Sequence, residues 1–528
     1  MKKLLLLLIL SVTSTAFAVP VENEMYFQAM KDEMNRTLSE LRLPGEVKPF
    51  YVAYWLKENF EFKRAASLGS LQAVTPERKG MTGHGVVEVG SAADSSRGFS
   101  RSEEYRLPYG WLPDSYEGVR TGLWELSDLL YLEAVDRYKR KKAYLRKKSL
   151  QDKLPDFVPA KTGVFIEEIT PWQAPEAKTL EIWLQKISSW GKEESFLEDF
   201  VVQAVKLQEN IYFLNNRGGK FQSQYTAYSI VVQAEFRQPD GYEETKEQTV
   251  YLKDFSPEEL TRTESKLRDF LAVVRAQYGA KTGDAYVGPV LYKPQAAADF
   301  LNVLLLGELN QTVPFLVEDK DEDSQASLWR KKLGQRILSP GITIYDRPQA
   351  TEFEGISLEN KGVDLEGVPT QEIVLVANGR LQQLPLGQRP LDKKHVSNGH
   401  AFFTEQIAPR EGLSNVFVEP ETQLTDAQME EKLLERCREL ELEYCYIKHS
   451  KGDFERVYTQ DGHKERMVGL ADVNLSARSL RDVEVAGGET RFSRNRFDII
   501  TPSMLVNEVE IVPQDRKPGR KPFISKPQ

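Results

Sequence analysis

The stretch VGPVLYKPQAAADFLNVLLL, residues 287–306, decides the fold of the second half of this chain. It begins with a short apolar strand, Val287 to Leu291, and continues into an apolar helix from Ala296 to Leu306. A polar, Gly-containing break at 279–284 precedes it. Because such breaks separate packed units, we expect the main domain boundary there.

Before the break, the pattern predicts helices packed with an antiparallel sheet. Helical patterns lie at residues 27–41, 123–148, 178–190 and 256–277, and strand patterns at 51–55, 209–214 and 225–236. The last helix has a strong start, because Ser256 can cap it and Glu259 completes a capping box. Asn and Gly at 215–219 tolerate positive φ and predict a hairpin turn.

After the break, the chain is richer in strands. Strands are indicated at 342–345, 373–377, 416–418 and 505–511, a hairpin at Asn378-Gly379, and one capped helix from Thr425. The predicted fold class is therefore α+β in two domains. We expect an N-terminal α/β domain with an antiparallel sheet at 19–280 and a β-rich domain at 285–515. Residues 516–528, rich in Lys, Arg and Pro, are predicted to be a disordered tail.

Length and composition favour a soluble protein of more than one domain. The chain has 528 residues, 40% of them hydrophobic and 28% charged, with a net charge of −9. This charge provides no global positive field for nucleic acid. The long helix has a basic end at 137–148, but helix C-termini favour cations, so a solvated face explains it better than a nucleic-acid site.

The first eighteen residues have the pattern of a signal peptide. Lys2 and Lys3 precede the apolar run Leu4 to Leu10, and small residues at Ala16 and Ala18 predict cleavage after Ala18. The apolar run is shorter than the roughly 20 residues that span a bilayer. A buried N-terminal helix is the alternative reading. We expect an exported mature protein, periplasmic or secreted, with no membrane span.

The chain contains two cysteines, Cys437 and Cys445. Export would permit a disulfide between them. A bridge requires Cα atoms within about 7 Å, which sequence does not establish. Two free buried thiols are the other possibility, and both stay open at this point.

Five histidines are the first place to search for a metal site: His84, His395, His400, His449 and His463. A zinc helix needs two imidazoles that face one ion. Only His395 and His400 lie near each other, in a loop with Asn398 and Gly399, so ordinary polar loop residues are the better interpretation. No metal and no cofactor is predicted.

Other motifs of catalysis or ion binding are incomplete. The acidic run at 318–323 resembles a calcium loop, but Ser324 and Arg330 occupy positions that need Gly and Glu. The sequence has no nucleophile elbow, phosphate-binding loop or dinucleotide fingerprint. The residues alone therefore indicate an exported α+β protein without a recognisable catalytic set.

The order of segments resembles the TldD/PmbA family, also called modulators of DNA gyrase. The resemblance rests on 288–292 and the following helix, 333–338, 342–344, 366–369, the Asn378-Gly379 hairpin, 397–400 and 501–510. The N-terminal helix, the 215–219 turn and the Ser256 helix are also similar to the family's first domain. The resemblance implies the family's two-domain fold over nearly the whole mature chain.

In the peptidase branch of that family, the helix after the Gly-Pro strand carries His-Glu-x-x-x-His, and a later Cys completes the zinc site. Here the corresponding stretch, 292–300, reads YKPQAAADF, and no His lies between His84 and His395. The chain therefore looks like the PmbA, or TldE, branch, which lacks zinc ligands and pairs with a zinc-bearing TldD subunit.

The resemblance implies a non-catalytic partner or peptide-binding subunit, either with a TldD-like subunit or as a homodimer. The peptide-binding residues implied by position are Tyr292, Gln295, Ser397, Asn398, Gly399 and His400, and a turn and a core-facing helix are their structural alternative. A second hypothesis is an active hydrolase with His400 as its acid–base group, which would lose activity near about pH 6.5. A third is an envelope scaffold without peptide affinity.

Overall fold

The computed structural model describes residues 23–100, 115–147, 154–309, 316–317, 326–402, 409–494 and 497–515. The predicted signal peptide at 1–18 and the predicted tail at 516–528 lie outside these described residues. Within the described part of the chain, no helix is both long and apolar enough to cross a membrane.

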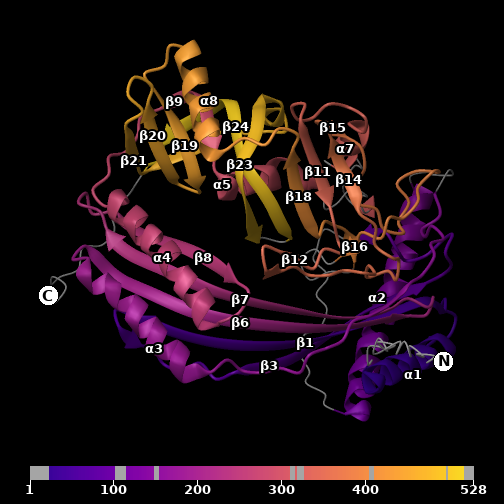
Figure 1. The fold of residues 1–528 in the computed structure, drawn as a ribbon. Helices are drawn as coiled ribbons and strands as arrows, with labels where there is room; N and C mark the ends of the chain where they lie inside the picture. The colour runs from indigo at the N-terminus through magenta and orange to yellow at the C-terminus, as the bar shows by residue number, and fades with distance from the viewer. Residues whose placement is uncertain are drawn as a thin grey trace, which may run out of the picture.

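A long curved sheet forms the first half (Figure 1). Its strands in the described residues are β1 (Pro49–Ser67), β2 (Ser70–Leu71), β3 (Arg78–Val89), β5 (Val164–Ile166), β6 (Leu197–Asn215), β7 (Lys220–Arg237) and β8 (Glu243–Leu252). The antiparallel centre is β1–β6–β7, with β2 and β3 along the outer edge of β1 and β5 and β8 along β7. The central strands have 18 or 19 residues each. At about 3.4 Å per residue they extend about 60 Å.

Alternate side chains of β1 face two different layers. Val52 and Tyr54 are buried in a core shared with two helices, whereas Tyr51 and Trp55 are buried in a core that includes Val363 of the second half. A strand with both faces covered has few polar positions near its start. The helices of this half are α1 (Glu24–Glu40), α2 (Tyr116–Lys147), α3 (Ala177–Ser188) and α4 (Pro257–Gln277).

A second sheet lies above the first (Figure 1). The described residues give its central order as β15-β14-β11-β18-β24-β9-β19-β20-β21, with β22 and β23 also paired to β24. The bounds are β9 (Tyr286–Tyr292), β11 (Ile342–Asp346), β14 (Ile373–Ala377), β15 (Arg380–Leu381), β18 (Asn415–Pro420), β19 (Tyr444–Ser450), β20 (Asp453–Tyr458), β21 (Lys464–Met467), β22 (Leu470–Val473), β23 (Val483–Arg494) and β24 (Asp498–Pro513).

Smaller elements complete the second half. Two-stranded pairs are β4 (Phe99–Ser100) with β10 (Leu316–Val317), β12 (Glu352–Phe353) with β13 (Ile356–Ser357), and β16 (Ala401–Phe402) with β17 (Arg410–Glu411). The helices are α5 (Pro294–Leu301), α6 (Gly307–Leu309), α7 (Ala326–Lys331) and α8 (Asp426–Glu439). The α+β class, with an antiparallel sheet first and a strand-rich second half, is confirmed.

Two predicted helices differ in detail from the structure. The long helix begins at Tyr116 rather than near 123, because the Ser115 hydroxyl accepts a bond from Gly118 N and caps it. The predicted helix 296–306 is α-helical only to Leu301 and then widens into a π-helix. There Gly307 N donates to Asn302 O, five residues back.

The two halves meet at the predicted hairpin turn 215–219. Asn215 Nδ2 donates to Glu366 O at 2.9 Å, and Gly163 N donates to Gly367 O at 2.8 Å. Gly367 has φ +82°, and a Cβ there would collide with the Asn215 amide and Gly219. This close approach requires glycine. The change of sheet falls between α4 and β9, while the domain limits 19–280 and 285–515 stay a prediction.

Candidate functional site

The family resemblance implies that the zinc ligands of the peptidase branch would fall on α5. Pro294 occupies its first turn, where a missing N–H costs nothing. Lys293, the residue before it, binds Glu430 at 3.1 Å and lies 3.6 Å from Asp426, both on α8. The start of α5 is therefore held to α8 by charge.

The exposed side of α5 carries a small polar cluster. Gln295 is exposed, and its Nε2 donates to Asp299 Oδ1 at 3.3 Å. Its Oε1 accepts from the Ser493 hydroxyl on β23 at 3.1 Å. The Gln295 amide and the Asp299 carboxylate offer both donors and acceptors to a ligand at this surface, whereas Ser493 itself is buried.

Tyr292, another predicted peptide-binding residue, is fully buried. Its hydroxyl donates to Asp472 Oδ2 at 2.8 Å, and Lys448 Nζ binds the same oxygen at 2.6 Å. Burial and the neighbouring Asp472 charge raise the pKa of Tyr292. Contact of this phenol with a peptide would first require β9 to be uncovered.

The predicted loop 397–400 is hydrogen-bonded to residues 384–386. Asn398 Oδ1 accepts from Leu386 N at 2.8 Å, and its Nδ2 donates to Leu384 O at 2.9 Å. The Ser397 hydroxyl donates to Leu386 O at 3.2 Å. Gly399 has φ +73°, and a Cβ there would collide with the Pro369 carbonyl. These contacts fit the structural alternative, a turn, and Asn398 alone of the four is half-exposed.

His400, the predicted acid–base residue, is fully buried beside Asp346 at the end of β11. Its Nδ1 lies 3.0 Å from Asn398 O, and its Nε2 lies 3.4 Å from Asp346 Oδ2, longer than a standard hydrogen bond. Asp346 accepts from Ser414 N, Ser414 Oγ and Asn415 N at 3.0, 2.7 and 2.9 Å. Burial alone would raise the pKa of Asp346, but the nearby His400 and the hydrogen bonds from Ser414 outweigh burial, so the pKa is lowered.

A second buried carboxylate, Asp364, accepts a hydrogen bond from Ala401, the residue after His400. Asp364 Oδ1 accepts from Glu366 N and Val368 N, each at 2.9 Å, and Oδ2 accepts from Ala401 N at 3.0 Å. Burial raises its pKa to about 7, although these backbone bonds act in the opposite direction. The sequence analysis did not identify Asp364, and its only signal was the Glu366-Gly367 turn that follows it.

Two buried ion pairs lie near Asp364. Arg97 pairs with Glu366, and its guanidinium lies 4.2 Å from the centre of the Phe157 ring. Arg389 pairs with Glu411 at 2.7 Å, both almost fully buried. Burial lowers the pKa of Arg97. Arg97 precedes a segment that the structure does not describe, and nothing in its sequence neighbourhood indicated an ion pair with residues almost 270 positions away.

The two predicted halves of the site are connected through β24. From Gln295 the contacts run to Ser493, which pairs with Ile499 across β23 and β24. The neighbouring Asp498 N donates to Ser414 O, and Ser414 binds the Asp346 carboxylate beside His400. The family resemblance implies that both segments lie near one site, and the structure connects them through this series of contacts rather than by a direct bond between Gln295 and the 397–400 loop in the described hydrogen bonds.

The His395 ring is also held by contacts within its own loop. Its Nδ1 accepts from Leu391 N at 3.0 Å, and its Nε2 lies 2.7 Å from Gly387 O. Both nitrogens thus have backbone partners, which agrees with an ordinary polar loop residue. Among the residues with described placement, no group of three or more His, Cys, Asp or Glu side chains is arranged to hold a metal ion.

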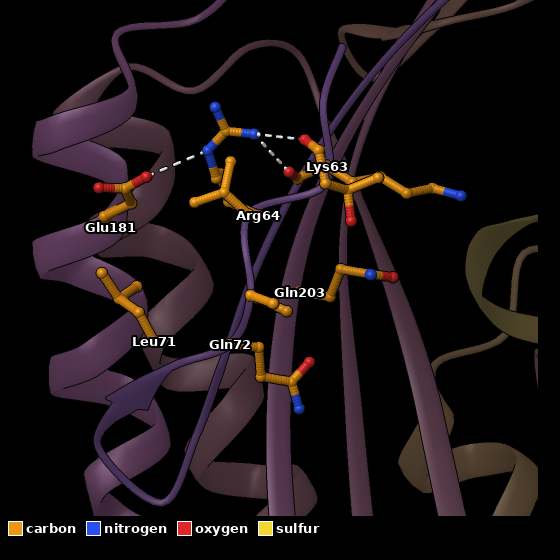
Figure 2. A pocket seen from close by; sticks show the side chains of 10 residues that line it. Lys63, Arg64, Leu71, Gln72, Glu181 and Gln203 are labelled. Carbon is orange, nitrogen blue, oxygen red and sulfur yellow. Dashed lines mark hydrogen bonds and ion pairs between the residues drawn. The ribbon is translucent and has the colours of Figure 1, made fainter. Parts of the chain in front are cut away.

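A cavity of about 50 Å³ lies elsewhere, on the first sheet (Figure 2). Arg64 crosses it to bind Glu181 at 3.0 Å and Thr75 O at 3.1 Å, and Gln203 also lines it. This volume holds a few water molecules and is too small for a peptide side chain with its solvent. All its lining residues belong to the first half, so it is separate from α5 and the 397–400 loop.

Arg494 at the end of β23 links the two sheets. It binds both oxygens of Asp498, at 2.7 and 3.0 Å, and donates to Ser357 O at 3.1 Å. Its guanidinium lies 4.8 Å from the ring centre of Tyr225 on β7 and 5.1 Å from that of Tyr251 on β8. Arg494 therefore connects the two sheets through cation–π contacts with the first sheet and a bidentate ion pair within the second.

Replacement of Arg494 by Ala is expected to lower the free energy of unfolding by about 2–3 kcal/mol, because Asp498 then keeps a buried charge without its partner. Urea denaturation measures the loss. Arg491→Ala is the matched control, since Arg491 lies on the same strand, is 65% exposed and pairs with the exposed Glu489 at 2.7 Å. Equal effects of the two substitutions would contradict a stabilising role for Arg494.

Comparison with known proteins identifies relatives of the second half and of the overall fold. Residues 285–513 match the model of the PmbA/TldA metallopeptidase C-terminal domain. TldE from Thermococcus kodakarensis has a similar fold, with a TM-score of 0.61 and 15% identity over 92% of this chain and 100% of that one. No curated protein matches the chain in sequence.

Two further solved structures have the same fold. One, from Thermotoga maritima, is described as a candidate modulator of DNA gyrase and has a TM-score of 0.60 at 15% identity, over 92% of this chain and 100% of that one. Another candidate modulator, from Bacteroides thetaiotaomicron, has a TM-score of 0.56 at 12% identity, over 92% and 98%. The domain match spans β9, α5 and the 397–400 loop. Residues 285–513 therefore belong to the PmbA/TldA metallopeptidase C-terminal domain family, and the chain as a whole shares the fold of these solved structures.

Proposed function

We propose that this chain is an exported TldD/PmbA-family subunit that binds a peptide or a zinc-bearing partner and does not itself hydrolyse peptides. The observation that carries the proposal is the exposed side of α5. It presents Gln295 and Asp299, bound to each other and to Ser493, where a zinc site needs a pair of imidazoles. An amide is a poor zinc ligand and a good partner for a peptide backbone.

The proposed contact surface includes fewer residues than the family resemblance implied for peptide binding. Tyr292, Ser397, Gly399 and His400 are buried. Gln295 is exposed and Asn398 is half-exposed. We therefore assign direct contact to the Gln295 cluster, while the 397–400 loop supports the neighbouring strands. The occupant is a zinc-bearing TldD-like subunit, a second copy of this chain or an extended peptide added to a strand edge.

Export is part of the proposal and is supported by the sequence of residues 1–18. Mass spectrometry of the secreted or periplasmic chain is expected to show an N-terminus at Val19. An intact Met1 on protein from the cytoplasm would contradict this part alone and leave the binding proposal open to the following test.

Zinc is expected to follow the partner rather than this chain. In a reconstitution with a paralogue that carries His-Glu-x-x-x-His, elemental analysis is expected to find about one zinc per paralogue and none on this chain alone. Peptide hydrolysis should require the paralogue. Stoichiometric zinc on the isolated chain, or peptide turnover by it, would overturn the non-catalytic assignment.

The binding surface has its own test. Gln295→Ala is expected to weaken association about tenfold, because an exposed hydrogen-bonding group is lost from the surface. Arg491→Ala, on the same strand as Ser493 and exposed, is the control. No measurable association with a paralogue, a peptide or a second copy would favour the envelope-scaffold alternative.

The hydrolase alternative depends on His400. Its complete burial and its position beside Asp346 disfavour contact with a substrate. If it were the acid–base group, turnover would be lost on replacement of His400 by Ala. Unchanged turnover in a folded His400→Ala variant would exclude this alternative.

A further inference from the structure

The two cysteines of the chain are brought together by the fold. Cys437 lies in the last turn of α8 and Cys445 near the start of β19. Both side chains are fully buried in the same hydrophobic core. These are the only two cysteines in the chain, so each thiol has one possible intramolecular partner for oxidation.

A tight connection holds the pair in place. Leu442 N donates to Cys437 O at 3.0 Å, which turns the chain back after the helix. Glu441 in this turn has φ +55°. Cys445 also contacts Val457 O on β20 at 3.7 Å. A short turn therefore joins the helix and the strand that bring both cysteines into one core.

We propose that Cys437 and Cys445 form a disulfide when this chain folds in an oxidising compartment. The proposal is independent of the peptide-binding function. In a reducing compartment the same two residues stay as thiols and pack as small apolar side chains. The native bond would join the end of α8 to the sheet that contains β9, while the start of α8 holds Lys293 before α5.

The oxidant is a disulfide of low molecular weight or of an exchange protein. One cysteine thiolate attacks the incoming disulfide, which leaves a mixed disulfide and releases one thiol. The second cysteine thiolate then attacks its neighbour's sulfur and releases the other thiol. The Cys437–Cys445 bond forms, the incoming S–S bond breaks, and the two protons and two electrons leave with the reduced oxidant.

Oxidation has to precede complete burial of the pair. Interaction with Cys437 and burial raise the pKa of the Cys445 thiol, and the thiolate is the form that attacks. Once α8 has packed on the sheet, a bulky disulfide also lacks access. The bond is therefore expected to form during folding and to stay inaccessible to reductant in the native protein.

The test is refolding of the purified, reduced chain in a buffer of reduced and oxidised glutathione. After folding, the protein is unfolded in guanidinium with N-ethylmaleimide, and adducts are counted by mass spectrometry. No adduct and a mass lower by two hydrogens are expected, and two adducts after reduction. Two adducts before reduction, or stable mixed disulfides with glutathione, would overturn the proposal.

A stability comparison supplies the second readout. The bond closes a loop of about nine residues, so the oxidised chain is expected to melt about 5 °C above the reduced chain. The double variant Cys437→Ala/Cys445→Ala should show no shift between oxidising and reducing buffers. Equal melting temperatures of the oxidised and reduced wild-type chain would mean that the bond does not stabilise the native fold.

Discussion

Replacement of Asp346 by Ala is expected to lower the free energy of unfolding by about 3–5 kcal/mol, the largest loss among the single changes considered. The carboxylate accepts bonds from Ser414 N, Ser414 Oγ and Asn415 N, and it lies 3.4 Å from His400 Nε2. Its loss leaves two backbone N–H groups and a hydroxyl buried without an acceptor. Urea denaturation followed by circular dichroism measures the change.

Two variants separate this effect from a simple loss of an acid. Asp346→Asn keeps one acceptor oxygen and is expected to lose about half as much stability as Asp346→Ala. Asp392→Asn removes an exposed carboxylate from the neighbouring loop and should change stability by less than about 0.5 kcal/mol. If Asp346→Ala were as mild as Asp392→Asn, the buried hydrogen-bond network would have no energetic importance.

Stability is also expected to fall as pH rises from about 4 to about 7, because over this range Asp364 ionises in the unfolded chain and stays protonated in the folded protein. Burial raises the pKa of this carboxyl in the folded protein to about 7, above about 3.9 for an unfolded Asp. Between these values the folded state holds a proton that the unfolded state has lost. The stabilisation is therefore complete below about pH 4 and disappears as pH rises through 7, with a slope of up to about 1.4 kcal/mol per pH unit.

Asp364→Asn isolates this contribution. The amide oxygen can still accept from Glu366 N and Val368 N, but the amide NH₂ then faces Ala401 N. We expect a loss of about 1–3 kcal/mol at pH 4 that shrinks toward pH 8, because the variant pays no ionisation cost. Denaturation curves of both proteins across this range give the difference. A pH-independent difference would show that Asp364 does not titrate in this window.

Two charged neighbours of Asp364 also influence the dependence of stability on pH. His400 and Arg97 both act on this carboxyl and favour its ionised form. The profile of the wild type is therefore that of a coupled cluster, and only the difference from Asp364→Asn belongs to Asp364. Asp392→Asn is again the control, and its profile should parallel that of the wild type.

Local signals in the sequence were sufficient for several elements. Ser256 caps α4 by accepting from Glu259 N, and Thr425 forms the predicted capping box with Gln428. Asn378 and Gly379 have the positive φ values that their hairpin required. These features depend on contacts between residues at most a few positions apart, so the sequence order contains the information that decides them.

The long strands were only partly predictable. The pattern indicated 51–55 and 209–214, whereas β1 and β6 each extend over 19 residues. Beyond the buried start of β1, polar residues such as Lys57 and Glu209 face each other as an ion pair at 2.7 Å. A half-covered sheet tolerates such residues, and its apolar alternation is therefore too weak to mark a strand.

The sequence by itself determined the two-part α+β organisation, the helix starts, the tight turns and the absence of imidazoles from α5. Only the tertiary structure decided which of the 79 acidic residues became buried, because Asp346 and Asp364 acquire their hydrogen-bond partners from segments up to 69 positions away. It also decided that His400 is enclosed and that Cys437 meets Cys445. Burial and pairing depend on how separate segments pack, and no local pattern encodes the desolvation that results.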